Sequence, residues 1–157
     1  MKKHETFMKI AIKEAEKNIR SMTGGPFGAC IVKNGKVVAV ACNTVLKNDA
    51  TCHAEVNAIR KASKKLRTFD LSGTTIYTTT EPCPMCFSAI HWARIKCIVY
   101  GSTIKDAARA GFNEMPISNK VMRRLGKCRI ELIPGVLKDE CVNLFQYWQK
   151  KHKGLKY

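Results

Sequence analysis

Acidic residues and long apolar stretches are both scarce in this sequence. Only 12 Asp and Glu stand against 28 Lys and Arg among 157 residues, which gives a formal net charge of +16. No apolar run approaches the roughly 20 residues that a membrane-spanning helix needs, so an integral membrane protein of the helical kind is not expected. Proline and glycine, at 5 and 10 residues, are too few for a low-complexity chain, and 45% hydrophobic residues are enough for a packed core.

A secretion signal is also missing from the first residues. Met1–Glu5 contains two lysines, but no apolar stretch follows them. We therefore expect a cytoplasmic protein with no membrane partner. The length predicts a single domain over residues 1–157.

The positive charge is spread along the chain rather than gathered in one segment. Residues 81–117 are nearly neutral, with four basic and three acidic residues, whereas 1–80 and 118–157 are strongly basic. A diffuse, lysine-rich surface is typical of a well-solvated protein, and nucleic-acid binding is the less favoured interpretation.

Hydrophobic periodicity predicts helices that alternate with strands. Apolar residues recur at helical spacing over residues 5–20, 53–66, 83–94, 117–125 and 139–151. Apolar and β-branched runs predict strands at 27–32, 37–42, 74–79, 96–101 and 128–133. Asn34-Gly35 joins the first two strands and is typical of a β-hairpin. This order predicts a layered α/β fold whose second half is a parallel sheet.

The eight cysteines do not predict a disulfide framework. Cys30, Cys42 and Cys97 fall in apolar, strand-like runs, where free cysteine behaves as a small hydrophobic residue. Only Cys83 and Cys86 have the spacing of metal ligands. In a reducing compartment this pattern favours metal binding or catalysis over cross-linking.

Two short segments carry the chemistry, His53-Ala54-Glu55 and Pro82-Cys83-Pro84-Met85-Cys86. Zinc takes four tetrahedral ligands, and a catalytic zinc keeps one position for water. His53, Cys83 and Cys86 offer three ligands and leave the fourth position open. The two cysteines lie one turn apart at a predicted helix start, where backbone N–H groups favour thiolates.

Glu55 follows His53 by two residues and would reach the open position without being a ligand. There it could take a proton from water and deliver it to a ring nitrogen and a leaving amine. Each segment taken alone has other interpretations. The Cys-x-x-Cys could be redox-active or half of a structural zinc knuckle, and the Glu could be a helix cap. The pieces together, His-x-Glu followed about 27 residues later by Pro-Cys-x-x-Cys, are the signature of zinc-dependent nucleobase deaminases.

Over nearly its whole length the chain resembles the cytidine/deoxycytidylate deaminase superfamily, and within it the bacterial guanine deaminases. The likeness is carried by six segments: Gly25–Ala29, Thr51–Val56, Glu81–Cys86, Ala89–Arg94, Ala110–Phe112 and Lys156-Tyr157. The resemblance implies a three-layer α/β/α sandwich with a mixed five-stranded sheet and one Zn²⁺ per subunit. It also implies hydrolytic deamination of a free purine base, guanine to xanthine plus ammonia.

The same resemblance implies roles for residues outside the zinc site. Phe27 and Trp92 would wall the pocket, Ala54 would line it, and Asn43 would hydrogen-bond the ring edge of the base. In a homodimer, the segment 136–157 would be exchanged between subunits, so that Tyr157 caps the partner's pocket.

The chain departs from the family pattern at two places. The relatives carry Asp after Ala-Gly-Phe, whereas Asn113-Glu114 stands here, so Glu114 is the candidate for a second catalytic proton carrier. The loop from Asn43 to His53 is one residue shorter than in the relatives and has Ala50 where proline is usual.

A tRNA-specific adenosine deaminase would use the same metal site and remains the main alternative. The net charge of the chain favours it. A basic cluster near the predicted helix 117–125 also favours it, although the same cluster could equally be a solvated helix face; it consists of Arg123, Arg124, Lys127 and Arg129. Trp92, Tyr157 and the nearly neutral segment 81–117 oppose it, because an RNA substrate needs cations at the pocket mouth. Cytosine or guanosine deamination is a closer variant, and a non-catalytic zinc or nucleic-acid module is disfavoured by Glu55.

Overall fold

A computed structural model of the chain describes residues 2–152. In chain order the elements are α1 (Lys2–Ser21), β1 (Gly28–Lys33), β2 (Lys36–Cys42), α2 (Ala54–Leu66), β3 (Thr74–Thr80), α3 (Pro84–Trp92), β4 (Cys97–Ser102), α4 (Ile104–Arg109), α5 (Asn119–Leu125), β5 (Glu131–Pro134) and α6 (Lys138–Lys151). The proposed capping residue Tyr157 lies outside the described residues. Within them, no helix combines the length and the apolar character needed to cross a membrane.

The five strands form one mixed sheet in the order β2-β1-β3-β4-β5. Strand β1 runs antiparallel to both β2 and β3, whereas β3, β4 and β5 are parallel. The predicted hairpin turn is present, with positive φ angles at Asn34 (49°) and Gly35 (73°), as a tight primed turn requires. The mixed sheet and its parallel second half are therefore confirmed.

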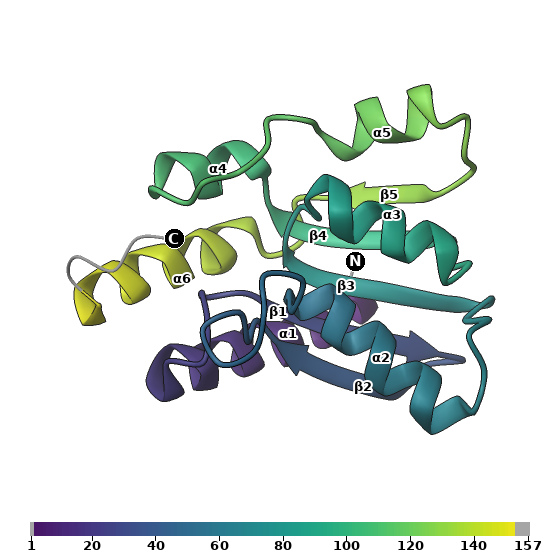
Figure 1. Ribbon diagram of the computed structural model, residues 1–157, viewed down its shortest axis with the longest axis horizontal. Coiled ribbons are helices and arrows are strands. Elements are labelled where there is room, and N and C mark those ends of the chain that lie inside the picture. Colours follow the sequence, from purple (N-terminus) through teal and green to yellow (C-terminus); the bar gives the residue numbers. More distant parts are fainter. Residues whose placement is uncertain (1, 153–157) are drawn as a thin grey trace.

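Helices cover both faces of the sheet, which gives the predicted three layers. Figure 1 shows α2 and α3 on one side of the strands and α1 on the other, where α6 packs against α1 and β4. Neighbouring strand residues face opposite layers: Ile76 belongs to the core cluster under α2 and α3, and Tyr77 to the cluster under α1.

One helix was not expected from the sequence. Helix α4 begins after Thr103, whose hydroxyl accepts the N–H of Asp106 while the Asp106 carboxylate accepts the N–H of Thr103. This reciprocal cap stabilises a helix of only six residues. Strand β5 begins at residue 131 rather than 128, because Lys127 has a positive φ of 48° and the chain is still turning after α5.

The sheet brings the starts of α2 and α3 to the same edge. Strand β2 ends at Cys42 opposite Gly28, the first residue of β1, and the end of β3 lies opposite the same part of β1, with Ala29 facing Thr78. Helices α2 and α3 follow these two strand ends in the chain, so their amino-terminal turns meet above one edge of the sheet.

Candidate active site

The three predicted metal ligands lie together at the two helix starts. His53 is the residue before the first turn of α2, and Cys83 holds the same place before α3, where Pro84 occupies the first helical position. The Cys83 Sγ and His53 Nδ1 atoms are 3.6 Å apart. Ligand atoms of His53, Cys83 and Cys86 all lie within 4.8 Å of one another.

The donor set fits zinc. One imidazole and two sulfurs are ligands that zinc prefers, and a three-residue set leaves a position for water. In the part of the chain that the structure describes, this is the one group of three or more such side chains that could hold a metal ion.

The two cysteines differ in the cost of becoming thiolates. A hydrogen bond from Cys86 lowers the pKa of Cys83 to about 4, against the opposing effect of burial and with help from His53. The same hydrogen bond raises the pKa of Cys86 well above its usual value, and burial adds to the rise. Burial by itself would lower the pKa of His53, but Cys83 and Glu55 outweigh it and the pKa is raised. Zinc binding therefore has to release the Cys86 proton.

Glu55 lies beside the ligand triad in the first turn of α2 and is buried. Its Oε1 accepts a hydrogen bond of 3.0 Å from the Thr78 hydroxyl, and its Oε2 lies 3.5 Å from the Cys86 Sγ. Burial raises the pKa of this carboxyl above its usual value. A carboxyl held next to the metal ligands, with a raised pKa, is placed to exchange protons with a group bound at the open position.

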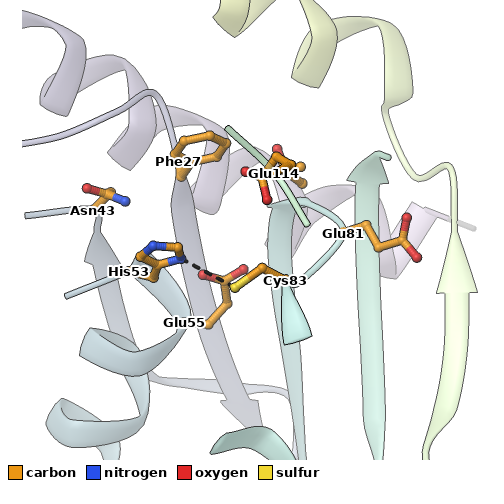
Figure 2. A pocket seen from close by; sticks show the side chains of 8 residues that line it. Phe27, Asn43, His53, Glu55, Glu81, Cys83 and Glu114 are labelled. Atoms are coloured by element: carbon orange, nitrogen blue, oxygen red, sulfur yellow. Dashed lines mark hydrogen bonds between the residues drawn. The ribbon is translucent and has the colours of Figure 1, made fainter. Parts of the chain in front are cut away.

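A pocket opens over this site. It consists of two adjoining hollows that share Phe27, Asn43, His53, Cys83 and Glu114, and the outer one has a volume of about 270 Å³. We call the two together the catalytic pocket. Its size suits a small ligand. Figure 2 shows Phe27, Asn43, His53, Glu55 and Glu114 arranged around the opening.

The structure brings Glu114 to the catalytic pocket from the segment between α4 and α5. Burial raises the pKa of this carboxyl to about 7, and the Cys83 charge adds to the rise while His53 opposes it. A carboxyl that titrates near neutral pH can both accept and donate a proton. Its catalytic role stays a prediction.

Phe27 is held in the pocket wall by two other aromatic rings. The centroids of Phe27 and Phe112 are 5.0 Å apart in an edge-to-face arrangement, and those of Phe27 and Phe145 are 6.0 Å apart. Phe145 belongs to α6, so the carboxy-terminal helix supports the substrate side of the pocket.

Trp92 is not brought to the catalytic pocket in this structure. It is 77% exposed at the carboxyl end of α3 and lines a separate hollow with Phe87 and Met122. The distance follows from helix geometry: Pro84 and Trp92 lie at opposite ends of α3, about 12 Å apart at 1.5 Å per residue. Ala54 is fully buried and packs in the core cluster rather than among the residues that line the pocket.

Sequence reasoning missed Glu81, a buried carboxylate in the lining of the inner hollow. The Glu81 carboxylate accepts the backbone N–H of Asn119 at 2.8 Å and that of Ile104 at 3.3 Å, at the first residues of α5 and α4. The Asn119 side chain donates to the Pro82 carbonyl at 2.5 Å, next to the ligand Cys83. These bonds hold the segment that carries Glu114 against the ligand turn. The sequence feature that could have pointed to this role is the glutamate directly before Pro82-Cys83.

Comparison with known proteins agrees with this site. The profile of the cytidine and deoxycytidylate deaminase zinc-binding region matches residues 1–102. The chain is 43% identical over 147 residues to the guanine deaminase of Bacillus subtilis strain 168, covering 93% of this chain and 94% of that protein. It is 34% identical over 159 residues to the tRNA-specific adenosine deaminase of the same organism, with 98% and 96% covered. A solved guanine deaminase from Nitrosomonas europaea superposes with a TM-score of 0.85 at 29% identity, over 93% of this chain and 84% of that one.

The fold and the ligand set together define a zinc-dependent nucleobase deaminase. The chain belongs to the cytidine and deoxycytidylate deaminase family. The predicted fold class, zinc cofactor and enzyme class are thereby confirmed.

Proposed function

We propose that this enzyme deaminates guanine as a free base, giving xanthine and ammonia with the consumption of one water. The observation that carries the proposal is the lining of the catalytic pocket. Among residues 2–152 that lining contains no Lys or Arg, although the chain has 28 of them. A pocket that takes a nucleotide of RNA needs cations for the neighbouring phosphates, whereas a neutral base does not. The likeness to the Bacillus subtilis guanine deaminase supports the same substrate.

Phe27 and Asn43 account for binding of a flat, polar ring. The Phe27 ring offers an aromatic surface against which a purine packs. The Asn43 Oδ1 accepts the backbone N–H of Val45 at 3.1 Å, which fixes the rotation of the amide toward the pocket. A fixed amide can recognise the hydrogen-bonding edge of one base in preference to another.

The residues around the metal site divide the chemistry between them. His53, Cys83 and Cys86 would hold zinc, which when bound acidifies a water molecule so that a nucleophile is available at neutral pH. The Glu55 carboxylate would transfer one proton of the attacking water to a ring nitrogen of the base and the second proton to the departing amine, which leaves as ammonia. Thr78 holds Glu55 in place for both transfers. Glu114, at the other side of the pocket, serves as a second proton carrier.

The test is ammonia release from a panel of substrates at one zinc per chain. Guanine, adenine, cytosine, guanosine and a tRNA with adenosine in the anticodon loop are offered at equal concentration. We expect guanine to be turned over fastest. Turnover of the tRNA without turnover of any free base would overturn the proposal.

A tRNA-specific adenosine deaminase is the second candidate, because the full-length likeness to the Bacillus subtilis enzyme of that kind is also high. The basic cluster Arg123, Arg124, Lys127 and Arg129 is exposed on and after α5, as an RNA contact would require. A gel shift with tRNA at two salt concentrations checks it, since binding through phosphates weakens steeply as salt rises.

We further propose that the working enzyme is a homodimer in which the segment 136–157 is exchanged and Tyr157 caps the partner's pocket. In the structure, α6 packs on β4 and α1 of its own chain, and Phe145 of α6 supports Phe27. In the exchanged dimer the contact with Phe27 would be kept, but Phe145 would come from the partner subunit. Light scattering gives the mass of the assembly, and loss of guanine turnover on deleting residues 153–157 tests the cap. A monomeric, fully active enzyme would refute both parts.

A further inference from the structure

Asn18 has no role in the site as described above, yet it is one of the most highly connected polar side chains in the fold. It lies near the end of α1 and is 1% exposed. Its Nδ2 donates to three backbone carbonyls, those of Gly25 at 2.7 Å, Asn43 at 2.9 Å and Gly24 at 3.2 Å. Its Oδ1 accepts a hydrogen bond from the Thr23 hydroxyl.

The three carbonyls belong to the two segments that form the base-binding side of the catalytic pocket. Gly24 and Gly25 lead into Phe27, whose N–H donates to the Gly25 carbonyl at 2.8 Å. Asn43 follows β2, and its N–H donates to the Phe27 carbonyl at 3.1 Å. The two candidate base contacts are therefore joined to each other, and Asn18 is bonded to both segments from behind.

The two segments are packed in direct contact. A Cβ added to Gly24 would lie 2.1 Å from the Asn43 Oδ1, so the loop and the Asn43 side chain are in direct contact. A shift of the loop by a few tenths of an ångström would therefore displace the Asn43 amide.

Only a side chain with N–H donors can satisfy these buried carbonyls. Aspartate has nearly the same shape as asparagine but offers no donor when ionised, and an aliphatic side chain offers none at all. Buried carbonyls without a donor would move toward water or toward other donors. The Thr23 hydroxyl bond to Oδ1 fixes which end of the Asn18 amide faces the carbonyls.

We propose that Asn18 is a positioning residue that sets the distance and orientation of Phe27 and Asn43 for the base. This inference rests on the proposed function, because it takes Phe27 and Asn43 as the contacts of the bound base. Asn18 acts through these two segments and touches neither the base nor the zinc ligands. It sets substrate affinity, and the proton transfers at Glu55 are left intact.

The experiment compares Asn18→Asp with Asn143→Asp, the same change at an exposed position of α6. Zinc content, thermal unfolding, kcat and KM for guanine are measured for both. We expect Asn18→Asp to keep one zinc per chain and to raise KM about 10-fold or more with a kcat change below threefold, and Asn143→Asp to match the wild type. Hydrogen exchange should rise in peptides covering residues 23–28 and 42–45 and stay unchanged around Cys83.

Thr23→Val is the milder second variant should Asn18→Asp fail to fold. It keeps the volume and removes the hydroxyl that orients the Asn18 amide, and we expect a KM rise of about threefold. A folded, zinc-loaded Asn18→Asp with unchanged KM and unchanged exchange in these peptides would overturn the positioning role. Equal loss of kcat and zinc would also overturn it, because it would show a merely structural role.

The wild-type enzyme separates the two proposals. No guanine turnover by the wild type refutes the proposed function, and the hydrogen-exchange comparison then still decides the role of Asn18. Normal guanine turnover by the wild type with no effect of Asn18→Asp refutes the positioning role alone.

Discussion

The replacement Glu55→Gln isolates proton transfer from the rest of the active site. Glutamine has nearly the shape of glutamate, and its Oε1 can still accept the Thr78 hydroxyl bond, which is 3.0 Å long in the structure. The zinc ligands are untouched, because Glu55 is not one of the three donors. What disappears is a group that can take up and release a proton at working pH.

The size of the loss follows from what Glu55 does. A positioned acid or base contributes about 10²–10⁴-fold to a rate, and here one carboxyl is assigned both the acceptance and the return of the proton. We therefore expect kcat for guanine to fall by at least about 10³-fold, equivalent to about 4 kcal/mol of transition-state stabilisation.

The assay pairs initial rates of ammonia release with metal analysis of the same preparation. Thr78→Val is the matched control, since it removes the hydrogen bond to Glu55 but keeps the carboxylate. We expect a loss of about 10-fold for the control, in line with one lost hydrogen bond. Near-normal turnover by zinc-loaded Glu55→Gln would show that another group moves the proton, and the assignment to Glu55 would be wrong.

Three further outcomes are expected. Cys83→Ser should bind well below one zinc per chain by metal analysis, because the thiolate with the lowest pKa is lost. Glu81→Gln turns an amide N–H₂ toward a backbone N–H of Asn119 or Ile104, so thermal or denaturant unfolding should show a loss of roughly 1–3 kcal/mol. In metal-free protein the Glu114 carboxyl should titrate near pH 7, because burial disfavours its charge; zinc favours the carboxylate, so NMR should show a lower pKa after zinc is added.

The zinc site could be predicted from the sequence because its geometry is mostly local. Cys83 and Cys86 are separated by one helical turn, and Pro84 indicates where that turn begins. The meeting with His53 depends on sheet topology. Strand β1 lies between β2 and β3 and runs antiparallel to both, so these two strands, and the helix starts that follow them, end at the same edge of the sheet. The family pattern, rather than any local signal, supplied that information.

The remaining parts of the site depend on contacts between distant segments. Asn18 lies 25 residues before Asn43, and Glu81 lies 38 residues before Asn119, so neither role can be read from spacing. Trp92 shows the limit of a resemblance. The resemblance assigned Trp92 to the pocket, but in a single chain its position at the far end of α3 keeps it away from the catalytic pocket. The cap of α4 was readable, because Thr103 and Asp106 have the spacing of a capping box.

Three carboxylates line the inner hollow, and their surroundings indicate different roles for them. Glu81 has both oxygens bonded to backbone N–H groups at two helix starts, so it anchors the segments around it. Glu55 has one oxygen held by Thr78 and the other beside the metal ligands, so it can exchange protons while remaining in place. Glu114 comes from the irregular segment between α4 and α5 and is partly exposed at the pocket. Residue type alone cannot separate these roles; the hydrogen-bond partners do.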